Sequence, residues 1–288
     1  MANISFNTSL LNESNNEDPF QAEDYTMHVV TCIIIAVSLP LVLVAIYALY
    51  SLVRNDHVAP IYIINLLISD LMQLCCMIVW ESDLQEERIN DIVKSFYDCG
   101  LMASVHFMVC ISLERYLVIA HPLWYRFKRT IRISVAVCVV VWLIPIVLTC
   151  TVNLWETIFN PFLVFAMILI IPFPLFIFFL VGTLRALSTS VSVHSDEKQR
   201  IVAILVLVLL IYTLLFLPSV ILHIAENNDE TLYNLSFTLV KLSPLADLLL
   251  YVFIRKGTVG KLLTCVCCCK KENYDISNNI NTTHLDDI

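Results

Sequence analysis

Residues 104–123 read SVHFMVCISLERYLVIAHPL. Apolar side chains dominate the first half of this stretch, and the charged pair Glu114-Arg115 then stands beside Tyr116. A helix needs about 20 mainly apolar residues to cross the hydrocarbon core of a bilayer. The run from about residue 92 to 119 is long enough, so the quoted stretch indicates the last turns of a membrane-spanning helix and the loop after it.

Seven runs of this kind occur along the chain, and they explain an unusual composition. Hydrophobic residues make up 59% of the chain and charged residues 15%, whereas soluble domains average roughly 45–50% and about 25%. This excess of apolar side chains excludes an ordinary soluble enzyme. Because helices satisfy every backbone hydrogen-bonding group inside lipid, we expect an all-α membrane protein, a seven-transmembrane helix bundle. The expected spans are about 27–53, 60–80, 92–119, 133–153, 161–186, 200–225 and 232–254.

The distribution of charge indicates the orientation. Lys and Arg concentrate in the segments that follow the first, third, fifth and seventh spans, and the positive-inside rule places those segments in the cytoplasm. Residues 1–26 carry five acidic residues and neither Lys nor Arg. We therefore expect a multi-pass plasma-membrane protein with an extracellular amino terminus. The net charge of −8 argues against a nucleic-acid partner.

Two tails flank the expected transmembrane domain, residues 27–254. Residues 1–26 form an extracellular tail whose Asn-X-Ser sequons predict glycosylation; the acceptors are Asn3, Asn7 and Asn12. Residues 255–269 are predicted to form a short amphipathic eighth helix, and residues 270–288 a cytoplasmic tail. Juxtamembrane cysteines beside lysines are typical of S-palmitoylation; the candidates are Cys265, Cys267, Cys268 and Cys269. The other cysteines lie in apolar spans, and no disulfide is expected.

A set of polar, aromatic and proline residues recurs in a definite order through these spans. They are the stretch Asn65–Asp70, Glu114-Arg115-Tyr116, His121-Pro122-Leu123, Trp142, Pro172 and Pro174, Phe216-Leu217-Pro218 and the stretch Asp247–Tyr251. The set resembles the rhodopsin-like (class A) G-protein-coupled receptors, and the resemblance covers about residues 27–269. The residue pattern in 104–127 and 178–187 is most similar to that of the family branch that includes purinergic, lipid and proton-sensing receptors.

The resemblance implies a coupling surface and an activation switch. In that family the arginine corresponding to Arg115 is held by its acidic neighbour and meets the G protein after activation. The loop after it docks on the G protein, a proline breaks span six as a hinge, and a tyrosine in span seven swings inward. The implied residues are Glu114, Arg115, Tyr116, His121, Pro122, Leu123, Pro218 and Tyr251.

The resemblance also implies an ion site. Asp70, Ser104, Ser243 and Asp247 stand where the family holds a sodium ion in its inactive state. Two carboxylates close together in a low dielectric repel each other unless a cation or a proton lies between them. Sodium and a shared proton are therefore both open readings. No other cofactor is expected.

The ligand pocket implied by the family geometry is lined by Trp80, Tyr97, Asp98, Met102, Phe216, His223, Glu226 and Lys241. A lysine inside a span is costly and needs a partner. Lys241 either binds an anionic ligand group, with Asp98 holding it in the empty state, or forms a structural pair with Asp98. A retinal Schiff base on Lys241 is a third reading, although Val93 stands where visual opsins carry a glutamate. The histidines His28 and His223 would suit an acid sensor.

Several positions depart from the family pattern. Val42, Leu180, Phe216 and Leu248 replace an asparagine, a tyrosine, a tryptophan and a proline, and Asn90 replaces a disulfide cysteine. Pro244, four residues before Leu248, could supply a substitute kink. These changes put the efficiency of coupling in doubt.

The sequence therefore predicts a receptor, not an enzyme, embedded in a lipid bilayer. It is expected to bind an extracellular ligand, either an anionic small molecule or a lipid, and to activate a heterotrimeric G protein. A proton-sensing receptor and a receptor-like protein with impaired signalling are the alternatives. A transporter is disfavoured because the sequence shows no internal repeat.

Overall fold

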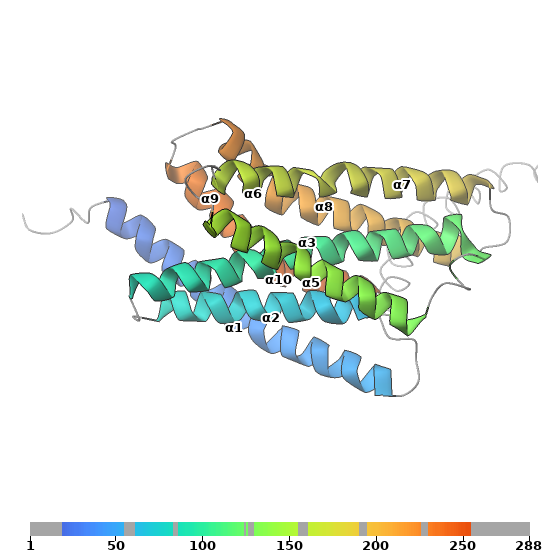
Figure 1. Ribbon diagram of the computed structural model, residues 1–288, viewed down its shortest axis with the longest axis horizontal. Helices are drawn as coiled ribbons and strands as arrows, with labels where there is room; N and C mark the ends of the chain where they lie inside the picture. The colour runs from blue at the N-terminus through green and yellow to red at the C-terminus, as the bar shows by residue number, and fades with distance from the viewer. Residues whose placement is uncertain are drawn as a thin grey trace, which may run out of the picture.

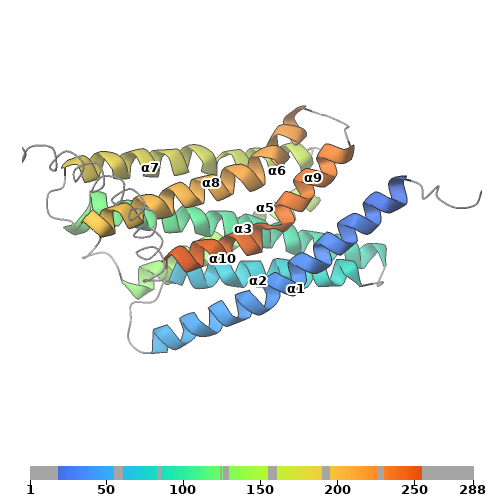
Figure 2. The same ribbon diagram turned by 180° about the vertical axis from the view of Figure 1, so that it is seen from behind.

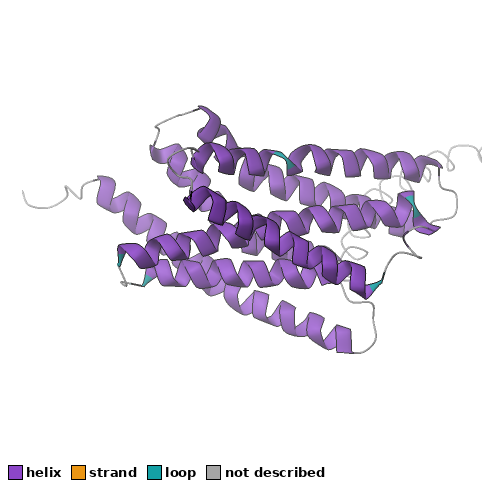
Figure 3. Ribbon diagram, in the orientation of Figure 1, coloured by secondary structure: helices purple, strands orange, loops and turns teal. Residues whose placement is uncertain are grey.

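The structure, a computed structural model, is helical almost throughout the part of the chain that it describes. Within that part no residue belongs to a strand (Figure 3). The described residues are 19–54, 61–82, 86–123, 125, 130–154, 161–189, 195–225 and 230–254. The helices are α1 (Pro19–Arg54), α2 (Ile61–Glu81), α3 (Glu87–Ala120), α5 (Ile131–Leu154), α6 (Pro161–Ile170), α7 (Pro172–Thr189), α8 (Ser195–Ala225), α9 (Glu230–Lys241) and α10 (Ser243–Ile254).

These helices confirm the seven spans predicted from the sequence. Six helical spans are each long and apolar enough to cross a membrane, and α9 and α10 form a seventh span with a bend of 41°. The fifth span is divided into α6 and α7 at Ile171, immediately before Pro172. The bend between α9 and α10 lies at Leu242, two residues before Pro244. The kink expected near Pro244 is thus present.

Helix α3 lies in the middle of the bundle, where it contacts α2, α5, α7 and α8 (Figure 1). In the most apolar stretch of α3, 67% is buried inside the protein, whereas in that of α5 only 17% is buried. From behind, α1 crosses α2 and the bent pair α9–α10 (Figure 2). The central position of α3 explains why its face carries polar as well as apolar residues: they contact protein on most sides.

The helices alternate in direction, so each end of the bundle gathers a definite set of residues. α1, α3, α6 and α9 begin at one end, where α2, α5 and α8 finish (Figure 1). This is called the His28 end, since His28 lies near the start of α1. The opposite end, where α3 finishes, is called the Arg115 end. There Arg200 at the start of α8 donates a hydrogen bond to the carbonyl of Ile254 at the end of α10.

The outside of the bundle is apolar, which is the reverse of a soluble protein. Large hydrophobic side chains are exposed along the outward faces of several helices, among them Val44, Tyr47, Val147, Phe178 and Leu214. Such a surface is stable only against lipid, because water would leave each of these side chains unfavourably hydrated. The polar residues are accordingly turned inward or placed at the two ends.

Helix α8 contains the proline that was expected to act as a hinge. It runs as one helix from Ser195 to Ala225 with Pro218 inside it, and the kink expected at Pro218 stays a prediction. Proline removes one backbone hydrogen bond, but neighbouring helices in a membrane bundle can hold such a helix together. Here Phe216 and Val220, on either side of Pro218, are buried in the core.

A glycine allows α2 and α3 to approach closely. A Cβ atom at Gly100 would lie 2.9 Å from Met72 Cε, 3.1 Å from Gln73 Cγ and 3.3 Å from the Ser69 carbonyl oxygen. Two of these atoms belong to side chains, but the third is helix backbone, which cannot move alone. Gly100 is therefore required by packing between α2 and α3.

Substituting Gly100 by alanine is expected to lower the free energy of unfolding by about 1–3 kcal/mol, the usual cost of overpacking. The thermal midpoint of the purified protein in lipid nanodiscs measures the effect. Asn90→Ala is the matched control, since Asn90 is exposed on the same helix. An unchanged midpoint for Gly100→Ala would show that α2 and α3 have room to separate.

Candidate functional site

A buried polar cluster joins α2, α3 and α10. Asp70, Ser104 and Asp247 are fully buried there. The Ser104 hydroxyl donates a hydrogen bond of 2.9 Å to Asp247 Oδ2, and Asp70 interacts electrostatically with Asp247. The Asp70 and Asp247 carboxyls are within hydrogen-bonding reach of each other, and Asp70 and the other oxygen of Asp247 accept no hydrogen bond from any other group in the described part of the chain. The two acidic groups thus share one buried cluster, and their mutual repulsion requires a cation or a proton between them.

Ser243 reaches the same region through a residue that the sequence reasoning missed. Ser243 Oγ donates a hydrogen bond of 3.1 Å to Gln73 Oε1, and Gln73 Nε2 donates one of 3.4 Å to the Ser69 carbonyl. All three residues are fully buried. Gln73 follows Asp70 by three residues, about one helical turn, and that spacing in an apolar span is the signal that would have revealed it.

Lys241 is buried at the end of α9, with only 7% of its surface exposed. Its Nζ donates a hydrogen bond of 2.9 Å to Thr31 Oγ1 on α1, and it lies 4.8 Å from the centre of the Phe237 ring. Among the described residues no ion pair joins Lys241 to Asp98, so the expected pair with Asp98 is wrong. The bend at Leu242 and the position of α1 direct this ammonium group toward Thr31.

The aromatic residues expected in the pocket make two ring contacts within the main hydrophobic cluster. Trp80 on α2 and Tyr97 on α3 form a tilted pair with ring centres 4.9 Å apart, and Met102 is buried further along α3. Phe216 on α8 instead packs against Tyr212, with ring centres 5.0 Å apart. The Tyr97 hydroxyl is buried without a hydrogen-bond partner, which is an unusual cost for a phenol in a core.

At the Arg115 end, Glu114 has two partners. Arg115 Nη2 lies 3.6 Å from Glu114 Oε2, and the Tyr125 hydroxyl donates a hydrogen bond of 2.6 Å to Glu114 Oε1. Glu114 is largely buried, so both contacts are shielded from water and stronger than at an open surface. The acidic residue therefore restrains the arginine, and Tyr125, which the sequence reasoning did not single out, restrains the acid.

Tyr116 packs into an aromatic group between α3 and α7. Its ring centre lies 5.9 Å from that of Phe178 and 5.8 Å from that of Phe179. A Cβ atom at Gly182 would lie only 2.7 Å from the Tyr116 ring. The absence of a side chain at Gly182 thus makes room for Tyr116. The loop residues that follow, His121, Pro122 and Leu123, are exposed, while Tyr251 is buried.

Residues 40–252 match the profile of the family described as 7 transmembrane receptor (rhodopsin family). This match covers well over half of the chain and spans the polar cluster, Lys241 and the Glu114-Arg115 pair. The chain belongs to this receptor family. It is therefore a multi-pass membrane receptor and not an enzyme, as the sequence predicted.

Known relatives of this receptor include two proteins named G-protein coupled receptor 68. The Mus musculus protein is 25% identical over 279 residues, which cover 82% of this chain and 76% of the relative. The Homo sapiens protein is 24% identical over the same shares. The type-1 angiotensin II receptor of Meriones unguiculatus is 31% identical, but over only 33% of this chain and 29% of the relative. The receptor is thus similar over most of its length to the first two.

Three of the positions at which the receptor departs from the family pattern lie in the core. Val42 and Phe216 are fully buried and Leu248 is 7% exposed. All three belong to the main hydrophobic cluster. At Val42 apolar packing therefore replaces the expected asparagine, and Asn65 on α2 accepts a hydrogen bond of 3.0 Å from Trp142.

Several predicted residues fall outside what the structure describes. His223 lies in α8, but its side chain is not described, and Glu226 is outside the described residues. The same holds for the predicted eighth helix, the glycosylation sites Asn3, Asn7 and Asn12, and the palmitoylation sites Cys265, Cys267, Cys268 and Cys269. The described cysteines are free thiols.

Proposed function

We propose that this receptor binds an extracellular ligand whose anionic group contacts Lys241, and that binding activates a heterotrimeric G protein at the Arg115 end. The observation that carries the proposal is the buried ammonium group of Lys241, which is hydrogen-bonded to a hydroxyl and lies against an aromatic ring. Glu81 acts on it electrostatically, but the Glu81 carboxylate is in contact with His28. A buried charge is costly without a counter-charge. An anionic ligand, either a small molecule or a lipid headgroup, would supply that counter-charge.

The arrangement of the two ends supports this division of roles. Lys241, Trp80 and Tyr97 lie toward the His28 end, and Glu114 and Arg115 lie at the opposite end. Positive residues follow α3 and α7 in the sequence, and the positive-inside rule assigns the Arg115 end to the cytoplasm. The ligand then approaches from outside and the G protein from inside. Ligand binding shifts the population of receptor conformations toward the one that binds the G protein.

We further propose that the cluster of Asp70, Ser104 and Asp247 holds a sodium ion. Carboxylate and hydroxyl oxygens are the ligands that hard cations prefer, and the Ser104 hydroxyl is the only other group in the cluster that donates a hydrogen bond to these two carboxyls among the described residues. A shared proton between Asp70 and Asp247 is the competing arrangement. Either would neutralise the repulsion between the two carboxylates, and a sodium titration separates them.

Replacing Lys241 by glutamine is expected to weaken an anionic agonist by about 30-fold or more, because removing one partner of a buried charge pair costs about 2–5 kcal/mol. Cells expressing the receptor are exposed to carboxylates, nucleotides and lysophospholipids, and dissociation of the G protein is recorded. The Lys241→Gln curve is compared with wild type for each active compound. Lys94→Gln is the matched control, since Lys94 is an exposed lysine near the same end.

The panel also tests the alternatives. An agonist that acts equally on wild type and Lys241→Gln would contradict the proposed role of Lys241. Signalling that rises between pH 8 and pH 6 without any added compound would favour the proton-sensing alternative. No G-protein response to any compound or pH, with normal surface expression, would favour a receptor-like protein with impaired signalling.

A further inference from the structure

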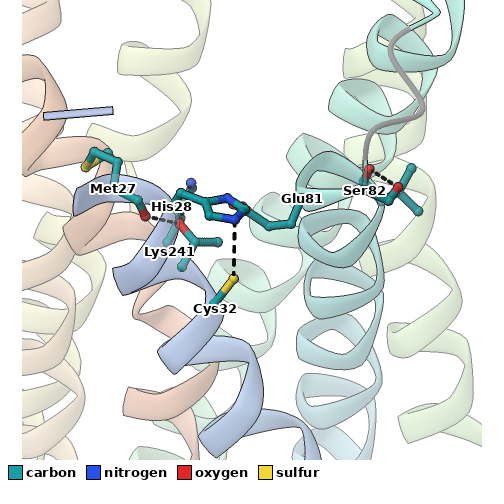
Figure 4. Close-up of polar contacts among 8 residues, drawn as sticks. Met27, His28, Cys32, Glu81, Ser82 and Lys241 are labelled. Atoms are coloured by element: carbon teal, nitrogen blue, oxygen red, sulfur yellow. Dashed lines mark hydrogen bonds and ion pairs between the residues drawn. The ribbon is translucent and has the colours of Figure 1, made fainter. Parts of the chain in front are cut away.

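Three metal-ligating side chains meet at the His28 end, apart from the residues assigned to ligand and G protein. They are His28 and Cys32 on α1 and Glu81, the last residue of α2 (Figure 4). An imidazole nitrogen, the thiol sulfur and a carboxylate oxygen all lie within 4.8 Å of one another. Cys32 Sγ is 4.0 Å from His28 Nε2, and His28 Nδ1 contacts Glu81 Oε2.

The chain brings these residues together in two ways. His28 and Cys32 are four residues apart, so they lie on the same face of α1 one turn from each other. Glu81 reaches them because the end of α2 packs beside the start of α1, as Figure 4 shows. Neither helix alone carries the set, so the arrangement depends on the contact between α1 and α2.

We propose that His28, Cys32 and Glu81 form a binding site for Zn²⁺. Zinc takes nitrogen, sulfur and oxygen ligands at about 2.0–2.3 Å in tetrahedral geometry, which sets neighbouring ligand atoms roughly 3.3–3.6 Å apart. One ligand atom from each of the three residues lies within 4.8 Å of the others. In the structure Cys32 faces His28 Nε2 and Glu81 faces Nδ1, so zinc binding requires the side chains to rotate until one ring nitrogen faces both. The fourth position is left for water. Ca²⁺ and Mg²⁺ are poor candidates, because they require oxygen ligands.

The charge balance suits this position at the end of the spans. Binding displaces the thiol proton of Cys32 to solvent, because the thiolate is the metal ligand. The thiolate and the Glu81 carboxylate then neutralise the two positive charges of the ion. The imidazole binds in its neutral form, and any proton that it shares with Glu81 also passes to solvent. The side chains of His28 and Glu81 are 53% and 17% exposed, so other protein atoms do not enclose the site.

Zinc at this site would connect α1 to α2. It would also bind the Glu81 carboxylate, which acts electrostatically on Lys241. Lys241 is hydrogen-bonded to Thr31, one residue before Cys32. Coordination of Glu81 by zinc reduces the negative charge that acts on Lys241. The metal site is therefore adjacent to the buried ammonium group, although its existence does not depend on any ligand for Lys241.

The test uses the full-length receptor in nanodiscs after removal of metals with a chelator. Maleimide labelling of Cys32, followed by mass spectrometry of its peptide, is measured during titration with ZnCl₂. We expect zinc to protect Cys32 from labelling, and we expect H28A and E81Q each to shift the protecting concentration at least about tenfold. The thermal midpoint of the wild-type receptor is expected to rise with zinc, and C32S is expected to lose most of that rise.

Controls separate this site from others. His106→Ala is the matched histidine control, since His106 lies on α3 and bonds to the Met102 carbonyl. MgCl₂ and CaCl₂ are expected to leave Cys32 labelling unchanged. The proposal is overturned if zinc fails to protect Cys32, or if protection is the same in wild type, H28A and E81Q. Because the labelling readout is specific to Cys32, zinc bound elsewhere on the chain does not mimic the expected result.

Discussion

Alanine in place of Arg115 is expected to reduce agonist-driven G-protein activation by at least about tenfold, while the receptor still reaches the cell surface. In the structure Arg115 is restrained by Glu114 at 3.6 Å, and Tyr125 holds the other oxygen of Glu114. When the contacts of Glu114 with Arg115 and Tyr125 break, the guanidinium group becomes available to donate hydrogen bonds to the G protein. Loss of one such contact costs about 2–5 kcal/mol, which corresponds to roughly 30-fold or more.

Arg132→Ala is the control for this experiment, because Arg132 is an exposed arginine at the same end of the bundle. G-protein dissociation is recorded together with surface expression for both variants. A response of Arg115→Ala equal to that of wild type would contradict the proposed coupling surface. An equal loss in Arg132→Ala would show only that positive charge at this end is needed.

Sodium is expected to raise the thermal midpoint of the purified receptor, and Asp70→Asn is expected to abolish that dependence. At a sodium concentration of ten times Kd, binding stabilises the folded state by about 1.4 kcal/mol, which raises Tm by about 3–6 °C. The cause is relief of repulsion between Asp70 and Asp247, which are both fully buried. Midpoints are compared in NaCl and in choline chloride at equal ionic strength.

Asp98→Asn is the matched control, since Asp98 is a partly buried carboxylate in α3 outside this cluster. It should retain the sodium effect. Equal midpoints for wild type in the two salts would exclude sodium and leave the shared proton between Asp70 and Asp247. A sodium effect that persists in both Asp70→Asn and Asp247→Asn would place the ion elsewhere.

Most of the fold could be predicted from local features of the sequence. Runs of about 20 apolar residues leave few structures possible in lipid, because each backbone donor and acceptor must be satisfied within the segment. The bend near Pro244 was likewise predictable, since proline removes a backbone hydrogen bond. Pro218 lies inside a continuous helix among buried neighbours, so the kink that the same rule predicts there stays a prediction.

The residues of the polar cluster could be predicted, but their partners could not. Asp70 and Asp247 stand out as charges in apolar runs. Gln73 was missed, although it binds Ser243, because an uncharged amide draws less notice than a carboxylate. Lys241 was expected to pair with Asp98, because a charge inside a span needs a partner, whereas in the structure its ammonium group donates a hydrogen bond to Thr31 of α1.

The sequence by itself determined that this protein spans the membrane with seven helices and that Arg115 and the buried acids lie inside or at the ends of those helices. Hydrophobic length and the cost of burying charge are properties of single segments, so they can be read along the chain. The tertiary structure alone decided which side chains meet: Ser104 with Asp247, Lys241 with Thr31, and His28 with Glu81. Such contacts depend on the rotation and tilt of neighbouring helices, which packing between helices sets.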